Sequence, residues 1–339
     1  MKGLNKIILA AAALITVPSV ITSCSDWTEA EPKDFYTPPS PDYYNNLKDY
    51  FKSPHEVMFG WFGNWGGTLQ QNSLTGLPDS VDFVSLWLTW GPLTPDQQAD
   101  LKAFQARGSR AVLCWLATNI GENITPGYSG VPPLAAAEEF WGFTDGDLES
   151  MCAAARKYAD AIADTCEKYG INGFDMDIEA HGTLIHYDTD GKNQVQNEFL
   201  RQLRKRFNKP DDLLVIDIPG GAGWLSYYGE LDDDVVESVD YICWQTYELG
   251  PSGLDYFFES VKRWKPDLFE KVLAKSIVTA TFERAVDKHY FLEQSTWKSS
   301  TGLPHAGQGA YHIEYDYAGS PDYPTVREGI AIQNPPITQ

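Results

Sequence analysis

Residues 171–180 read Ile-Asn-Gly-Phe-Asp-Met-Asp-Ile-Glu-Ala, a segment in which acidic and apolar side chains alternate. Successive side chains of a β-strand point to opposite faces, so Asp175, Asp177 and Glu179 share one face and the apolar residues share the other. The apolar flanks and the long helical pattern before the segment favour an interior strand over an exposed edge strand with solvated acids. Burying carboxylates costs several kcal/mol each unless they are protonated or paired. The segment therefore predicts a functional cluster of acids.

The rest of the chain alternates short apolar runs with helical patterns. The expected strands are residues 57–61, 81–88, 110–116, 173–178, 213–218, 241–246, 272–282 and 310–315. The expected helices are residues 95–107, 146–169, 194–207, 254–264, 284–297 and, more weakly patterned, 323–332. Thr144 and Asp147 are expected to form a capping box, and Gly170 to end the same helix.

Continuous apolar strands that are each followed by a helix indicate a parallel sheet covered by helices. Eight such units favour a single (β/α)8 TIM barrel over an open doubly wound sheet, and no GxGxxG or Walker loop is present to support the latter. Glu179 ends its strand at the carboxyl side, where barrel enzymes place their chemistry. The neighbouring acids disfavour a further negative charge there, which suits Glu179 to the role of general acid.

Two strands resemble those of a known family. Residues 172–179 resemble the signature of glycoside hydrolase family 18, Asp-Gly-x-Asp-x-Asp-x-Glu on the fourth barrel strand, with Asn172 as the one departure. Residues 241–247 are similar to the family segment that ends in a conserved Tyr. Chitinases usually carry Met-x-Tyr-Asp there, whereas Gln245, Tyr247 and Glu248 look more like the endo-β-N-acetylglucosaminidases.

The resemblance implies substrate-assisted retaining hydrolysis of the GlcNAc-β-1,4-GlcNAc core of N-linked glycans, with no metal and no other cofactor. Glu179 would protonate the leaving oxygen, and Asp177 would hold the N–H of the substrate's 2-acetamido group. Asp175 would share a proton with Asp177. Tyr247 and Gln245 would bind the acetamido oxygen. The expected partner is an N-glycan or another N-acetylglucosamine-containing oligosaccharide.

Aromatic residues make up 13% of the chain, and such rings either line sugar-binding clefts or fill a core. The candidates for substrate contact lie at or near strand ends: Trp65, Trp115, Trp244 and Tyr311. The third and eighth strands lack the Ser-x-Gly-Gly segment and the Trp common in chitinases, which weakens the hypothesis of a chitinase. Two further hypotheses are a non-catalytic glycan-binding lipoprotein and a divalent-metal enzyme that uses the Asp-x-Asp-x-Glu acids as ligands. Activity in EDTA would exclude the metal enzyme.

The first residues of the chain predict where the protein is located in the cell. Two lysines and an apolar run precede Cys24, so residues 1–23 are interpreted as a lipoprotein signal peptide and Cys24 as the lipidated residue. Residues 24–50 are rich in acid and proline and are expected to form a tether, followed by the hydrolase domain at 51–339. Acidic residues after Cys24 resemble export signals of surface-exposed lipoproteins, which predicts a lipid-anchored, surface-exposed outer-membrane protein of a Gram-negative bacterium. The lipid anchor would be its only contact with the membrane.

The net charge is −21, with 47 acidic against 26 basic side chains, and such a surface repels phosphate backbones. Nucleic acid is therefore excluded as an expected partner. Four cysteines follow Cys24, and none has CxxC or Cys/His spacing, so buried thiols are expected rather than a zinc site.

Overall fold

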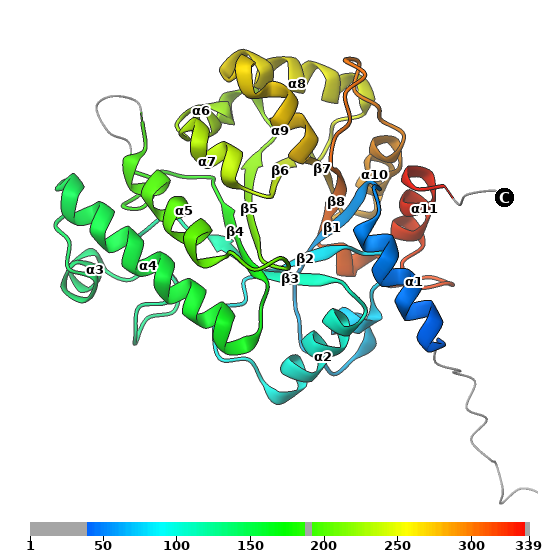
Figure 1. The fold of residues 1–339 in the computed structure, drawn as a ribbon, viewed down its shortest axis with the longest axis horizontal. Coiled ribbons are helices and arrows are strands. Elements are labelled where there is room, and N and C mark those ends of the chain that lie inside the picture. Colours follow the sequence, from blue (N-terminus) through cyan, green and yellow to red (C-terminus); the bar gives the residue numbers. More distant parts are fainter. Residues whose placement is uncertain (1–38, 187–191, 336–339) are drawn as a thin grey trace, which may run out of the picture. The chain divides into compact units, whose positions relative to one another are not determined.

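A computed structural model describes residues 39–186 and 192–335. Eight parallel strands close into a barrel in the order β1 to β8, with β8 paired to β1, and helices surround them (Figure 1). The strands are β1 Val57–Phe62, β2 Phe83–Trp87, β3 Arg110–Leu116, β4 Gly173–Asp177, β5 Leu213–Pro219, β6 Tyr241–Gln245, β7 Ser276–Thr281 and β8 Gly307–Tyr311. The predicted (β/α)8 barrel is confirmed.

Nearly every strand residue is buried, because one face of the barrel meets its interior and the other meets the helices. Two separate apolar clusters result. One fills the barrel and includes Phe59, Cys114 and Val215, whereas the other lies between strands and helices and includes Phe174, Met176 and Ile178. The apolar residues of β4 therefore face the helices, as the alternation predicts, and the acids between them face inward.

Helices α2 to α10 lie in the segments between successive strands, whereas α1 precedes β1 and α11 follows β8. They are α1 Pro41–Lys52, α2 Pro95–Ala106, α3 Leu134–Trp141, α4 Leu148–Tyr169, α5 Gln194–Arg206, α6 Leu225–Gly229, α7 Asp233–Ser238, α8 Pro251–Trp264, α9 Phe269–Lys275, α10 Lys288–Ser295 and α11 Pro324–Gln333. The long helix α4 packs against α5 beside β4. It positions the acidic strand by covering its apolar face.

Two expected strands differ from the structure in their bounds. The expected strand 272–282 begins as the end of α9, where Val272 and Leu273 are buried, because a short apolar run is compatible with either structure. The expected strand 310–315 is instead β8 followed by a 3-10 helix, Ile313–Asp316. His312 makes that turn with a left-handed φ of 54°.

Of the two caps expected for α4, the one at its C-terminal end is confirmed and the one at its N-terminal end is wrong. Gly170 ends the helix with φ 71°, as predicted, but the Asp147 side chain makes no cap bond and the Thr144–Asp147 capping box is wrong. Asp147 donates its backbone N–H to the Thr144 carbonyl instead. A complete capping box begins α2, where Thr94 and Gln97 satisfy each other's backbone N–H.

The predicted signal peptide 1–23 and the lipidated Cys24 lie outside the described residues. The predicted tether 24–50 extends too far, because helix α1 begins at Pro41. One face of α1 is anchored by Leu47, which is 8% exposed. Within residues 39–186 and 192–335, no helix combines the length and the apolar composition needed to cross a membrane.

Candidate active site

Three aspartates project into the barrel at the carboxyl ends of β4 and β5. Asp175 and Asp177 lie on β4, and Asp217 of β5 pairs in register with Asp177. Their exposed fractions are 0%, 2% and 1%. Glu179 follows β4 and is half-buried at the mouth of the barrel. The prediction that the alternating acids share the interior face is confirmed.

The glycine of the signature brings β4 close to β5. Gly173 has φ 151°, and a Cβ atom there would lie 1.8 Å from the Leu213 carbonyl oxygen. A side chain at this position is therefore incompatible with the strand pairing. Asn172 lies at the opposite end of the strand, where its Oδ1 accepts the Ala111 N–H at 3.0 Å. That bond gives the residue a structural role between β3 and β4.

Asp175 is the deepest of the acids. Its Oδ2 accepts the Ser85 hydroxyl at 2.6 Å and the Trp61 indole N–H at 3.2 Å, whereas its buried Oδ1 has no hydrogen-bond partner among the described residues. Burial raises the pKa of Asp175 to about 6, and the hydrogen bonds oppose that shift.

A single amide connects the other three acids. Gln245 Nε2 lies 2.6 Å from Glu179 Oε1, 2.7 Å from Asp217 Oδ1 and 3.3 Å from Asp177 Oδ1. An amide nitrogen has two hydrogens, so it cannot fully satisfy three acceptors. Burial raises the pKa of Asp177 well above its ordinary value, and the charge of Glu179 adds to the shift. Burial and the charges of Asp177 and Asp175 do the same to Asp217. Each of these buried aspartates therefore holds its proton to a higher pH than an exposed aspartate does.

Aromatic side chains form the walls of a small cavity above these acids. Tyr247 and Tyr311 stack with ring centroids 5.8 Å apart, and Trp61 meets Tyr247 edge-on at 6.5 Å. Trp87 meets Tyr311 edge-on at 5.9 Å. Burial raises the pKa of the Tyr247 hydroxyl well above its ordinary value, so it stays a hydrogen-bond donor. The cavity has a volume of about 170 Å³ and also contains Asp177, Glu179, Asp217 and Gln245.

Comparisons with known proteins agree with this geometry. The model for glycoside hydrolase family 18, BT1044-like, matches residues 27–259. A solved selenomethionyl Glu-to-Gln variant of BT1044 has 31% sequence identity and a TM-score of 0.72, covering 88% of this chain and 94% of its own. The chain belongs to glycoside hydrolase family 18.

Two more distant structures share the fold. An endo-β-N-acetylglucosaminidase from Cordyceps militaris is 19% identical with a TM-score of 0.63, over 88% of this chain and 98% of that one. A family 18 chitinase from Pseudoalteromonas aurantia is 14% identical with a TM-score of 0.54, over 80% and 97% of the two chains. No curated protein matches the chain at a significant level.

The aromatic residues predicted to contact substrate in this family 18 protein separate into two groups. Tyr311 lines the cavity, and Trp65 lines an adjoining groove although it is only 7% exposed. Trp115 and Trp244 are fully buried on the helix-facing side of the barrel, against Phe174 and Phe257. Their predicted substrate contact is wrong, because each directly follows a residue whose side chain faces the barrel interior.

Sequence reasoning missed three residues that complete the site. Asp217 lies in an otherwise apolar run, and an acid in such a run was the available signal. Trp61 is the penultimate residue of β1 and Trp87 is the last of β2, on the same inward-facing alternation as Phe59 and Ser85. Strand alternation marks their direction, but only barrel closure brings them to Asp175 and Tyr311.

Among residues 39–186 and 192–335, two sets of side chains have ligand atoms close enough to share a cation. One set is Asp177, Glu179 and Asp217, and the other is Cys114, Asp175 and Asp217, each with ligand atoms within 4.8 Å of one another. Burial raises the pKa of the Cys114 thiol, which makes the second set a poor one because a metal binds the thiolate. The first set could hold a divalent metal. The metal-enzyme hypothesis therefore predicts that EDTA abolishes activity.

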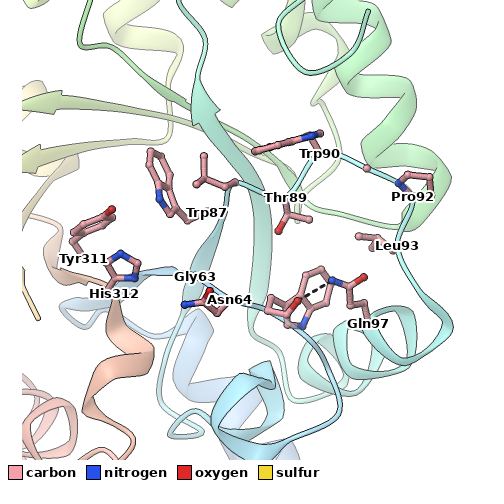
Figure 2. Close-up of a pocket in the computed structure, with 13 residues that line it drawn as sticks. Gly63, Asn64, Trp87, Thr89, Trp90, Pro92, Leu93, Gln97, Tyr311 and His312 are labelled. Carbon is pink, nitrogen blue, oxygen red and sulfur yellow. Dashed lines mark hydrogen bonds between the residues drawn. The ribbon is translucent and has the colours of Figure 1, made fainter. Parts of the chain in front are cut away.

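A groove opens beside the small cavity above the acids and has a volume of about 550 Å³ (Figure 2). It shares Trp87 and Tyr311 with the cavity. Its lining comes from the last residues of β2 and β8 and from the segments that follow β1, β2 and β8: Gly63, Asn64, Trp65, Trp87, Leu88, Thr89, Trp90, Gly91, Pro92, Leu93, Gln97, Tyr311 and His312.

Proposed function

We propose that this family 18 protein is an endo-β-N-acetylglucosaminidase that hydrolyses the GlcNAc-β-1,4-GlcNAc core of N-linked glycans. The observation that carries the proposal is the Gln245 amide bound to both Asp177 and Glu179 in a cavity lined by Tyr247. This is the Gln-x-Tyr form of the sixth strand, which resembles the endoglycosidases more than the chitinases.

The cavity is suited to a reaction in which the substrate supplies its own nucleophile. The 2-acetamido oxygen would attack C1 while Glu179 donates its proton to the leaving oxygen, forming an oxazolinium ion. Asp177 would accept the acetamido N–H and balance the positive charge. Gln245 and Tyr247 would donate hydrogen bonds to the acetamido oxygen. Glu179 would then accept a proton from the water that opens the ring.

The bound compound and the spacing of two substitutions in a variant of the Cordyceps militaris enzyme support the substrate class. Its double variant, with Asp-to-Asn and Glu-to-Gln changes two positions apart, was solved with fucosyl-N-acetylglucosamine-Asn. Asp177 and Glu179 have the same spacing in this chain. That compound represents the sugar–asparagine portion that remains on a protein after cleavage of the core.

The competing functions make different predictions. Chitinases are also among the related structures, so a chitin oligosaccharide is the second candidate substrate. A non-catalytic glycan-binding protein would retain the cavity without needing the acid, and the presence of Glu179 beside Asp177 weighs against it. A metal enzyme would lose activity in EDTA, whereas the proposed mechanism requires no metal.

Glycan release decides among these functions. The protein would be incubated with a high-mannose glycoprotein, a complex-type glycoprotein and chitin oligosaccharides, with and without EDTA, and the products analysed by mass spectrometry. We expect glycans ending in one N-acetylglucosamine from at least one glycoprotein, unaffected by EDTA. Glu179→Gln should lose about 10²- to 10⁴-fold of the rate with an unchanged melting temperature. Release only from chitin, or a Glu179→Gln rate within tenfold of the parent, would contradict the proposal.

We also propose that the chain is an outer-membrane lipoprotein of a Gram-negative bacterium, anchored at Cys24 and exposed at the cell surface. The support is the apolar run before Cys24 and the acidic residues after it, all of which lie outside the described residues. Labelled fatty acid should be incorporated into the parent chain and not into Cys24→Ala. Incorporation of labelled fatty acid into that variant would refute the anchor. If the protein on intact cells resists added protease, surface exposure is refuted.

A further inference from the structure

We propose that a basic pocket at the amino-terminal end of the barrel binds the phosphate group of a phosphate monoester. The pocket lies among α1, the start of β3 and the turns that lead into β4 and β5. The acids of the candidate active site lie at the carboxyl ends of β4 and β5, so the pocket is a separate site. The side chains that we assign to phosphate binding are Lys48, Lys52 and Arg110, and their role does not depend on the proposed hydrolase activity.

The charge of this pocket is the reverse of that of the whole chain. Three of the side chains that line it are basic and only Asp211 is acidic, whereas the chain has 26 basic and 47 acidic side chains. The pocket has a volume of about 610 Å³, within the roughly 300–1,000 Å³ of small-molecule sites. A concave site with one sign of charge raises the local concentration of ligands of the opposite sign, so this pocket favours anions.

Helix α1 brings two lysines to the pocket. Lys48 and Lys52 are both exposed and are four residues apart, so they lie on the same face of the helix. Like charges at this spacing destabilise a helix slightly, which means that the pair does not serve the stability of α1 itself. A Cβ atom at Gly108, in the turn before β3, would lie 2.9 Å from the Phe51 ring and 3.2 Å from Lys48 Cγ. This close packing holds the two charges beside the start of β3.

Arg110 supplies the third charge from the barrel itself. It is the first residue of β3 and shares the inward-facing alternation of Cys114, which lies inside the barrel. None of the three basic side chains forms an ion pair with an acid in the part of the chain that the structure describes, whereas the nearby Arg107 pairs with Asp79 at 2.8 Å. Their charges are therefore available to pair with an anion.

Asn172, the one departure from the family signature, also lines the pocket. Its Oδ1 accepts the Ala111 N–H at 3.0 Å and the Gln105 amide at 2.9 Å. Its Nδ2 donates to the Asp211 carbonyl at 3.2 Å. An aspartate here could not donate to that carbonyl and would add a second carboxylate to the lining. Asparagine therefore makes these hydrogen bonds and keeps the pocket positive.

A phosphate monoester matches the number and the charge of these groups. It carries a charge of about −1.5 to −2 at pH 7 and three strong acceptor oxygens, and the lining offers three cations. The guanidinium of Arg110 can bind two of these oxygens at once. Carboxylates and sulfate esters carry a single negative charge and match three cations less well. The half-buried Phe51 ring also lines the pocket and provides apolar surface for the organic part of the ester.

Calorimetry with phenyl phosphate and phenyl sulfate tests the pocket, because the two probes differ mainly in charge. We expect phenyl phosphate to bind the parent more tightly than phenyl sulfate does, and its binding to weaken as sodium chloride is added. Lys48→Gln/Lys52→Gln should weaken binding of phenyl phosphate at least about tenfold, since hydrogen bonds to a charged ligand are lost. Both lysines are exposed, so this variant should keep the melting temperature of the parent. Arg110→Gln should weaken binding by a similar factor.

Two further substitutions change the charge of the pocket in opposite directions. Asn172→Asp should weaken binding of phenyl phosphate and Asp211→Asn should strengthen it, each by roughly two- to fivefold, as expected for one charge near a protein surface. Asp211 is exposed, so its replacement should not alter stability. A purely structural role for the basic residues predicts no such opposite effects on affinity.

Lys262→Gln/Arg263→Gln is the matched control, since it removes two exposed positive charges from α8, outside the pocket. It should bind phenyl phosphate as the parent does. Equal affinity of the parent and Lys48→Gln/Lys52→Gln, or an equal loss in the α8 control, would overturn the proposal.

The molecule that carries the phosphate is tested separately. Protein made without residues 1–24 would be sedimented with phosphatidylcholine vesicles that do or do not contain phosphatidic acid, whose headgroup is also a phosphate monoester. We expect the protein to stay in solution with both kinds of vesicle, which would identify a soluble ester as the ligand. Sedimentation only with phosphatidic acid, abolished by Lys48→Gln/Lys52→Gln, would instead assign the phosphate to a lipid headgroup. If the parent binds neither phenyl phosphate nor these vesicles, the proposed phosphate site is refuted.

Discussion

Asp217 shows how one side chain outside the recognised signature changes the chemistry of the site. It pairs in register with Asp177 and shares the Gln245 amide with Asp177 and Glu179. Its pKa is raised well above the ordinary value by burial and by the charges of Asp177 and Asp175. The pKa of Asp177 is raised in the same way, so the two neighbouring carboxyls cannot readily carry two negative charges. We infer that they share a proton, and that its position on Asp217 lets Asp177 carry the negative charge that the oxazolinium ion requires.

Asp217→Asn tests this inference through the pH dependence of kcat/KM. The amide is uncharged at every pH, so the cluster can no longer lose the proton of Asp217. We expect activity within about tenfold of the parent at neutral pH, and an alkaline limb shifted to higher pH. Asp217→Ala, which removes the bond to Gln245 as well, should lose activity at all pH values. Superimposable alkaline limbs for parent and Asp217→Asn would show that Asp217 is not the group that titrates.

At the scale of elements, helix α1 stabilises the barrel end opposite the active site. Leu47 is buried, and the Tyr43 hydroxyl donates to Asp79 Oδ2 at 2.8 Å. The Phe51 ring packs so closely on Gly108 that a Cβ atom there would lie 2.9 Å from it. The sequence prediction assigned most of this helix to a tether, although its contacts are those of the folded domain.

Removal of α1 should therefore reduce stability without changing catalysis. A chain that begins at Pro54 should have a free energy of unfolding about 2–4 kcal/mol below that of a chain that begins at Pro39, because burial of Leu47 and part of Phe51 is lost. Urea unfolding measures the difference, and kcat/KM of the two folded chains should agree within about twofold. Equal unfolding midpoints would mean that α1 is dispensable for the barrel.

For the whole molecule, the buried acids make stability depend on pH. The pKa of Asp175 is about 6 in the folded protein, against about 3.9 for an unperturbed Asp in an unfolded chain. The folded state thus binds this proton more tightly, and the contribution of Asp175 to stability becomes less favourable as pH rises from about 4 to about 6. Above that range the penalty is constant.

Asp175→Asn should remove this penalty, since its amide oxygen can still accept from Ser85 and Trp61. At pH 7 the variant should be more stable than the parent by up to ~3 kcal/mol, and the gain should disappear below about pH 4. Chemical denaturation of both proteins across this range gives the difference, in which the other titrating groups cancel. A gain of equal size at pH 4 and pH 7 would show that packing, rather than ionisation, causes it.

Local rules were sufficient for much of the fold and for part of the site. Alternation within one strand places Asp175, Asp177 and Glu179 together, and the same rule places Gln245 and Tyr247 on one face. These relations involve residues two apart on one strand, so no knowledge of the neighbouring strands is needed. Continuous apolar runs between helical patterns likewise indicated the parallel barrel, because both faces of each strand are buried.

Tertiary structure alone decided which groups meet across strands. The pairing of Asp177 with Asp217, the contact of Trp61 with Asp175 and the groove built from three separate loops all depend on barrel closure and strand register. Trp115 illustrates the same limit, since its aromatic character suggested a sugar contact and its position on the strand turns it toward the helices. A sequence pattern specifies the direction of a side chain along its own strand, whereas its partners are set by backbone hydrogen bonds between strands far apart in the chain.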